Sequence, residues 1–155
     1  MSDDIAYDTD YLAAEGLLVE RLREELTTVP ERHVLTAPDL AEVDEQQQFT
    51  PAVHVIYAGD EVVESDDARA GDGGEQIVRQ RWYTVAAVRN VREPRAGAGA
   101  REAAGEILAE ILPTLAGWVP GAGYGPLVRR QAPEAAYSHG YFYVPLLWST
   151  TIATE

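Results

Sequence analysis

Two segments of the chain carry apolar residues at the spacing of an α-helix. Asp8 and Asp10 supply capping oxygens and negative charge at the start of the first helix, and Pro30 marks its end. Between about residues 10 and 28, apolar side chains recur three or four positions apart: Tyr11, Ala14, Leu18, Leu22 and Leu26. A second helix is predicted over about residues 100–116, where Pro113 should bend or tighten the last turn. Its apolar face consists of Ala104, Ile107, Leu108, Ile111, Leu112 and Leu115.

Runs rich in β-branched and aromatic residues predict the strands. The two longest runs are 51–65 (PAVHVIYAGDEVVES) and 76–91 (QIVRQRWYTVAAVRNV), joined by a charged, glycine-rich loop at 65–75. Weaker signals predict a strand at 33–37, a proline-started helical turn at 38–46, and strands at 127–135 and 140–154.

This order of elements predicts a single α+β domain, in which two amphipathic helices cover a mainly antiparallel or mixed β-sheet. The two longest strands should form a hairpin, and a second hairpin should close the chain. Residues 1–9 are expected to be a flexible, acidic arm, and residues 10–155 to form the domain.

Composition narrows the classes of function. The chain has 155 residues, 46% of them hydrophobic, which fits one globular domain. No apolar run reaches the ~20 residues that a membrane helix needs, and the acidic N-terminus does not resemble a secretory signal, so an intracellular, membrane-free protein is expected. The absence of cysteine excludes disulfides and thiolate chemistry. A net charge of −14 disfavours general nucleic-acid binding and makes copies repel one another unless acids and bases lie on complementary faces.

Ser138 and His139 are the most conspicuous candidates for catalysis. Adjacent strand residues point to opposite faces and no G-x-S-x-G elbow surrounds the serine, so a turn ahead of the last strand, at Gly140, is favoured over a catalytic site. His54 lies between apolar neighbours on a strand and is interpreted as a hydrogen-bonded, partly buried histidine rather than a metal ligand.

The glycine-rich segments give weak signals for ligands. The loop residues Asp66, Asp67, Asp72 and Glu75 do not have the spacing of an EF-hand, so a solvated loop is expected. GAGARE (97–102) places Glu102 where a dinucleotide fingerprint has its third glycine, and GAGYG (121–125) follows a helix instead of opening one. Both segments are interpreted as linkers, and no cofactor or metal ion is expected.

The basic residues are more informative, because all twelve are arginine, the residue preferred for interface ion pairs. Arg79, Arg81 and Arg89 alternate along one strand and so share a face, and Arg129 and Arg130 precede the last strand. A charged subunit interface and a solvated face both fit this pattern.

The aromatic residues near the C-terminus alternate on the last strand. Tyr141 and Tyr143 should lie on one face and Phe142 with Val144 on the other, where they pack in the core or against a neighbouring subunit. Pro145 cannot donate to a ladder, which indicates an edge position or a bulge. Base stacking would need a basic groove, which the net charge disfavours.

Over about residues 10–152 the chain resembles the bacteriophage tail terminator (tail completion) proteins, including those of contractile tail-like particles. The resemblance rests on the early helix, the alanine-rich second helix and four phrases: PAVHVIYAGDEVVES, QRWYTVAAVRNV, GWVPGAGYGPL and AYSHGYFYVPLLWST. It implies a structural, non-enzymatic protein that assembles as a ring, typically a hexamer, on the end of the tail tube. Such a ring stops tube polymerisation and provides the head-joining surface.

The resemblance also implies partners and a location. These are the tube protein, sheath and head–tail connector proteins, with DNA passing through the lumen without specific binding. The location is the bacterial cytoplasm during assembly and then the virion or tail-like particle. We expect the subunit or tube interface to include Asp66, Asp67, Arg69, Arg79, Arg81, Arg89, Arg129, Arg130 and Trp148. The alternatives are another head–tail joining component, or a small ligand-binding or hydrolytic domain that uses His54 or His139.

Overall fold

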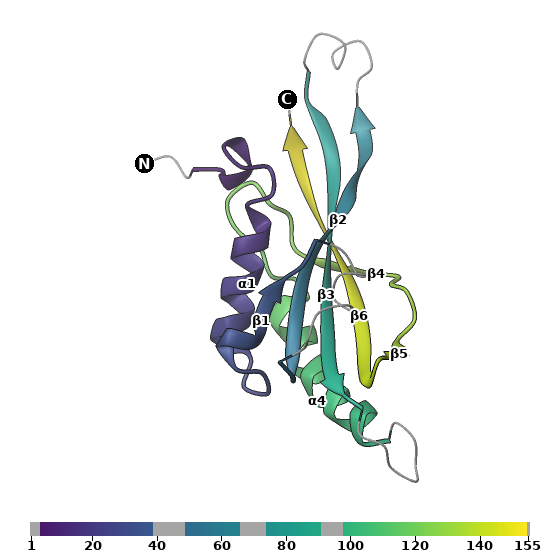
Figure 1. The fold of residues 1–155 in the computed structure, drawn as a ribbon. Helices are drawn as coiled ribbons and strands as arrows, with labels where there is room; N and C mark the ends of the chain where they lie inside the picture. Colours follow the sequence, from purple (N-terminus) through teal and green to yellow (C-terminus); the bar gives the residue numbers. More distant parts are fainter. Residues whose placement is uncertain (1–3, 39–48, 66–73, 91–97, 155) are drawn as a thin grey trace.

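The computed structural model describes residues 4–38, 49–65, 74–90 and 98–154 (Figure 1). Ten elements follow one another along these segments: η1 (Ala6–Asp8), α1 (Ala14–Glu25), η2 (Glu31–His33), β1 (Val34–Thr36), β2 (Ala52–Ser65), β3 (Gln76–Arg89), α4 (Ala98–Leu115), β4 (Val128–Arg130), β5 (Ala136–Ser138) and β6 (Tyr141–Thr154). The predicted helical turn at 38–46 lies almost wholly outside the described residues.

One mixed sheet organises the molecule. Its strand order is β1-β2-β3-β6-β4, and β5 also pairs with β6. The β1–β2 pair is parallel and the other pairs are antiparallel. The single α+β domain and the β2–β3 hairpin are therefore confirmed. A second hairpin closes the chain, but its first strand is β5 and not the segment predicted at 127–135.

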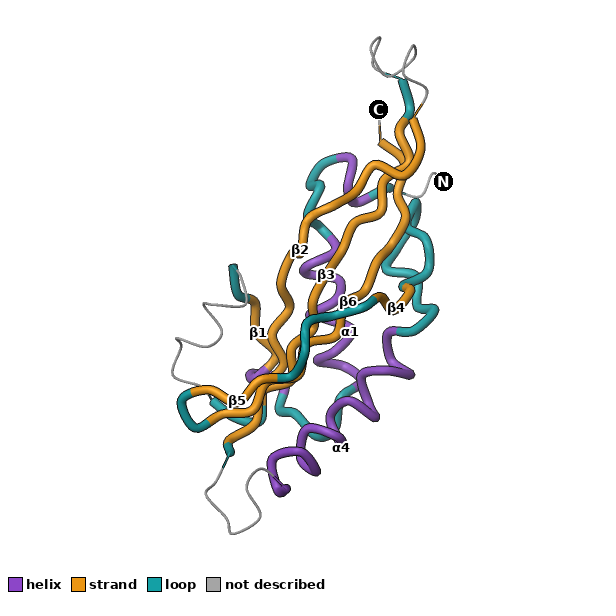
Figure 2. The backbone as a smooth tube through the Cα atoms, turned by 90° about the vertical axis from the view of Figure 1, so that its right-hand side faces the viewer, coloured by secondary structure: helices purple, strands orange, loops and turns teal. Residues whose placement is uncertain are grey.

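Both helices cover the same face of the sheet (Figure 2). α1 contacts β1 and β2, whereas α4 contacts β3 and β6. The alternation of β3 explains this packing, because its even-numbered residues from Val78 to Val88 point toward the helices and are buried. At the centre of this core, Trp82 and Trp148 lie opposite each other on β3 and β6, and both are fully buried.

The helix stripes predicted from the sequence form the core contacts, but the helix boundaries differ. α1 begins at Ala14 and its N-cap is Ala13, while Asp10 accepts a hydrogen bond from Leu12 N at 3.0 Å in the turn before it. Within the described residues α4 continues through Pro113 to Leu115. No helix among the residues described is long and apolar enough to cross a bilayer.

The N-terminal segment differs from the expected arm in the part that the structure describes. Tyr7 is buried in the core, its hydroxyl donates to the Gly123 carbonyl at 3.2 Å, and its ring meets that of Tyr124 edge-on at 5.0 Å. Because an aromatic side chain buries a large apolar area, it fixes this segment against the domain.

The last third of the chain also contains two departures. The strand predicted at 127–135 is shortened to β4, and residues 131–135 form a loop that contains Pro133. β6 is an interior strand, but β5 pairs with 141–143 and β4 with 147–149, so Val144, Pro145 and Leu146 pair only with β3. The proline, which was expected at an edge or a bulge, thus occupies the gap between two short partner strands.

Candidate subunit interface

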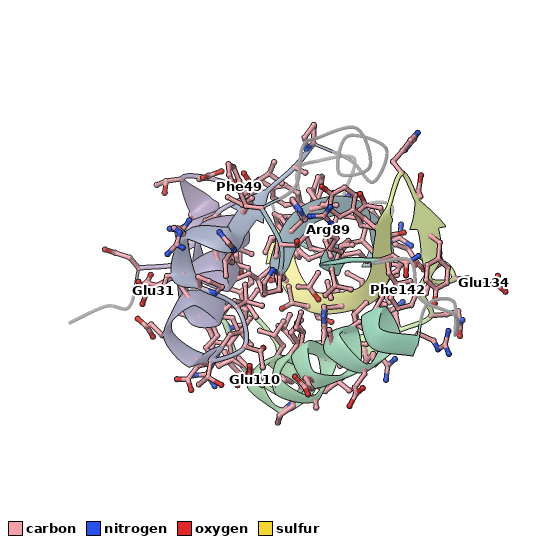
Figure 3. The ribbon with its side chains drawn as sticks, turned by 60° about the horizontal axis from the view of Figure 1, so that its bottom comes forward. Glu31, Phe49, Arg89, Glu110, Glu134 and Phe142 are labelled. Carbon is pink, nitrogen blue, oxygen red and sulfur yellow. The ribbon has the colours of Figure 1, made fainter. Side chains whose placement is uncertain are left out.

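The helix-free face of the sheet carries the arginines that the sequence placed together. Arg79, Arg81 and Tyr83 are half-buried on this face, while their neighbours Gln80 and Trp82 point to the helices. Arg89 lies at the far end of β3 on the side facing away from α4 (Figure 3). The prediction that the three arginines share one face of the strand is therefore confirmed.

Two of these guanidinium groups are incompletely satisfied. Arg79 pairs with Glu61 at 3.6 Å, but the buried Nε atoms of Arg79 and Arg81 have no hydrogen-bond partner within the described part of the chain. Arg81 lies beside Gly59, which forms the β2 bulge, and a Cβ on that glycine would lie 4.0 Å from Nη2. The two arginine side chains are half-buried and not enclosed, so the accessible parts of their guanidinium groups can pair with carboxylates from another molecule.

Arg129 and Arg130 are separated by strand alternation. Arg130 lies opposite Leu147 and donates from Nε to Ser149 Oγ at 2.9 Å, which places it with Arg79 and Arg81 on the helix-free face. Arg129 lies opposite Trp148 and therefore on the other face. We call the helix-free face with Arg79, Arg81, Arg89 and Arg130 the arginine face.

Trp148 corrects our expectation of an interface residue. Its side chain is fully buried, and its indole Nε1 donates to Thr84 Oγ1 at 3.0 Å. It therefore belongs to the core and is unavailable to a neighbour. Asp66, Asp67 and Arg69 lie outside the described residues.

A groove of about 550 Å³ lies beside the stretch of β6 that pairs only with β3. Its lining is Leu108, Arg129, Arg130, Gln131, Ala132, Pro133, Glu134, Val144, Pro145 and Leu146. The ligand-binding alternative required His54 or His139 in a pocket, and neither histidine lines this groove.

His54 is fully buried, more deeply than the partial burial expected. Removal from water lowers the pKa of His54 from 6.5 to about 4, so the imidazole is neutral at pH 7. Within the described segments, no group of three histidine, aspartate or glutamate side chains could hold a metal ion.

The tight turn predicted ahead of the last strand lies between β5 and β6 and consists of His139 and Gly140, while Ser138 is the last residue of β5. His139 and Gly140 both have positive φ angles (50° and 84°), as in a two-residue type I′ hairpin. The expectation that the two side chains point apart is wrong, because this turn brings Ser138 Oγ to 3.0 Å from His139 Nδ1. Ser138 is only half-buried and His139 is exposed, whereas nucleophilic catalysis needs a sheltered oxyanion site.

Sequence reasoning missed two features of the sheet. Val62 and Val63 are exposed near the end of the β2–β3 hairpin, although the pattern favours valine in a half-buried strand. Tyr11 donates to Asp60 at 2.5 Å and joins the start of the first helical region to β2. No local signal marks this contact, because its partners are 49 positions apart.

Comparison with known proteins supports one family. A family model described as phage tail terminator protein matches residues 8–155. A solved chain from the virion of a native gene transfer agent particle is similar in fold, with a TM-score of 0.55 and 13% identity over 94% of this chain and 98% of that chain. No curated protein sequence matches. Since the family model spans nearly the whole chain, this protein belongs to the phage tail terminator family and is a structural tail protein.

Proposed function

We propose that the chain forms a homo-oligomeric ring, typically a hexamer, on the end of the tail tube. The ring halts tube polymerisation and presents the surface to which the head is joined. The family match over residues 8–155 carries this proposal. It is supported by the arginine face, on which the side chains of Arg79 and Arg81 are half-buried and Arg89 and Arg130 are exposed.

The partners follow from this role. The ring contacts the tube protein on one side and head–tail connector proteins on the other, with sheath protein where the tail is contractile. Assembly takes place in the bacterial cytoplasm, and the ring stays in the virion or tail-like particle. DNA passes through the lumen without specific binding, since a net charge of −14 repels phosphate. We keep Asp66, Asp67 and Arg69 as proposed contacts of the loop between β2 and β3.

Electron microscopy of tails made with and without this chain tests the proposal. We expect tubes of uncontrolled length in its absence, and a return to uniform length when the chain is supplied from a plasmid. Unchanged tube lengths together with tails that lack heads would assign the chain to head–tail joining instead. Unchanged lengths with complete particles would refute both roles.

A further inference from the structure

The outer surfaces of the two helices have the opposite charge to the arginine face. Five carboxylates are exposed or half-exposed there, and we call them the acidic helix face: Glu15, Glu20, Glu24, Glu102 and Glu106. Two further carboxylates are already engaged, as are the three arginines of these helices: Arg23 donates to the Val34 carbonyl, Arg101 to the Tyr137 hydroxyl, and Arg21 pairs with Glu25. Glu25 pairs with Arg21 at 3.4 Å, and Glu110 accepts hydrogen bonds from Thr27 and Thr28.

The arginine face has little acid of its own. Among the strand side chains that the structure describes, Glu61 is the carboxylate that shares this face, opposite Arg79 in the ladder. Figure 3 shows the two sides together, with Glu110 on α4 and Arg89 on the side of β3 away from it. The two faces of the domain thus carry opposite charge.

We propose that the arginine face of one copy docks on the acidic helix face of the next. This inference rests on the proposed ring and names its contact. A sheet-to-sheet contact would bring arginines together, and a helix-to-helix contact would bring carboxylates together. Only the sheet-to-helix contact pairs opposite charges.

This contact is heterologous, because each copy uses two different surfaces. Repeating it generates a closed ring when the rotation between copies closes, and an open helix when it does not. Carboxylates from the neighbour would also pair with Arg79 and Arg81, whose side chains are only half-buried. The arrangement lets copies with a net charge of −14 associate in spite of their mutual repulsion.

Charge reversal tests the contact, with assembly measured by light scattering and by electron microscopy. We expect the Arg79→Glu, Arg81→Glu variant to weaken association by at least about tenfold, because each repulsive contact repeats around the ring. The milder Arg79→Gln, Arg81→Gln variant should weaken it less and reduce its dependence on salt. Circular dichroism and thermal unfolding show which variants are folded.

A second reversal on the helices should restore the ring. The reversal is added to the Arg79→Glu, Arg81→Glu variant in one of two pairs: Glu20→Arg with Glu24→Arg, or Glu102→Arg with Glu106→Arg. Each pair restores opposite charges across the contact. The matched control is Arg32→Glu, which makes the same type of change at an exposed arginine that belongs to neither the arginine face nor the acidic helix face and should leave assembly unchanged.

The outcomes separate this inference from the proposed function. Recovery of the ring with either helix reversal supports the sheet-to-helix contact. If wild type forms rings and stops tube growth, and the sheet variants do so equally well, the sheet-to-helix contact is wrong but the proposed terminator function stands. A wild-type chain that neither forms rings nor affects tubes overturns both. If the sheet variants fold but do not form the ring, and neither helix reversal restores it, then the helices are not the surface on which the arginine face docks.

Discussion

At the scale of single residues, His54 links the core to pH. The side chain is fully buried, and the pKa of the folded state lies near 4, below the ordinary value of 6.5. Between these two pH values the unfolded chain binds a proton that the folded chain excludes. The free energy of unfolding should therefore decrease as pH falls from about 6.5 to 4.

We predict that His54→Gln removes this dependence. Wild type should lose on the order of 3 kcal/mol across that window from this residue, by the conversion of a pKa shift into free energy. The His54→Gln variant should lose markedly less free energy of unfolding over the same pH range. Urea unfolding at pH 7, 5.5 and 4.5 measures both, and equal slopes for the two proteins would contradict the assignment.

Gly123 shows that the glycine-rich segment at 121–125 is a packed turn and not a linker. Its φ is +85°, and a Cβ there would lie 2.7 Å from Tyr7 Oη and 2.9 Å from Ile5 Cγ2. We predict that Gly123→Ala destabilises the fold by roughly 2–3 kcal/mol, since it combines backbone strain with a steric clash.

Gly117→Ala is the matched control for Gly123→Ala, because its φ is +77° but no heavy atom lies within 4 Å of the added Cβ. Gly117→Ala should lower the free energy of unfolding only through the strain of a positive φ, by about 1 kcal/mol. Thermal unfolding compares the two, and proteolysis should release the N-terminal segment sooner in Gly123→Ala. Equal losses in the two variants would show that Tyr7 and Ile5 do not constrain this turn.

At the scale of elements, Glu110 connects α4 to the end of α1. Its carboxylate accepts hydrogen bonds from Thr27 N at 3.1 Å and Thr28 N at 2.7 Å, and from both threonine hydroxyls. Burial alone would raise the pKa of Glu110, but these hydrogen bonds outweigh it and lower that pKa to about 2. This contribution to stability is present above pH 4.5 and is lost as pH falls toward 2.

We predict that Glu110→Gln lowers stability at pH 7 by about 1 kcal/mol, since a neutral amide accepts these hydrogen bonds less strongly. The difference in stability from wild type should shrink as pH falls from 4.5 toward 2, a range that lies mostly below the window of His54. Glu31→Gln, at an exposed carboxylate outside the acidic helix face, is the control and should have little effect. A difference that persists unchanged at pH 2.5 would contradict the role of the charged carboxylate.

The elements were predictable where one periodicity extends over many residues. The alternation of β3 fixed which side chains face the helices, and the stripe from Ala14 to Leu26 fixed the buried side of α1. Short-range patterns could not show that β4 and β5 are two short strands separated by a loop, because both are defined only by their pairing with β6. Tyr7 likewise lies in a polar stretch of sequence, so its burial could not be predicted without its distant partner, Gly123.

At the scale of the whole molecule, the arginines were recognisable from the sequence and the surface facing them was not. Alternation on one strand groups Arg79, Arg81 and Arg89. The acidic helix face becomes visible only when α1 and α4 lie side by side and their inner residues are buried. Trp148 was assigned to the interface because alternation along a strand predicts which side chains share a face. Alternation does not show which face the helices cover, and Trp148 is fully buried.

The salt dependence of assembly belongs to this scale. At high ionic strength exposed charges are screened over a few ångströms, so a ring held by arginine–carboxylate pairs should dissociate more readily. We predict a decrease in the mean assembly mass between about 50 mM and 500 mM NaCl, measured by light scattering. An increase in mass with salt would indicate that apolar contacts dominate and that charge repulsion opposes assembly.

The growth of tail tubes in the presence of the purified chain tests the central claim most directly. Tube protein is allowed to polymerise, the labelled chain is added while the tubes elongate, and the length distribution is followed by electron microscopy. We expect elongation to stop on addition and the label to lie at one end of each tube. Tubes that continue to grow at the same rate, with no label at their ends, would contradict it.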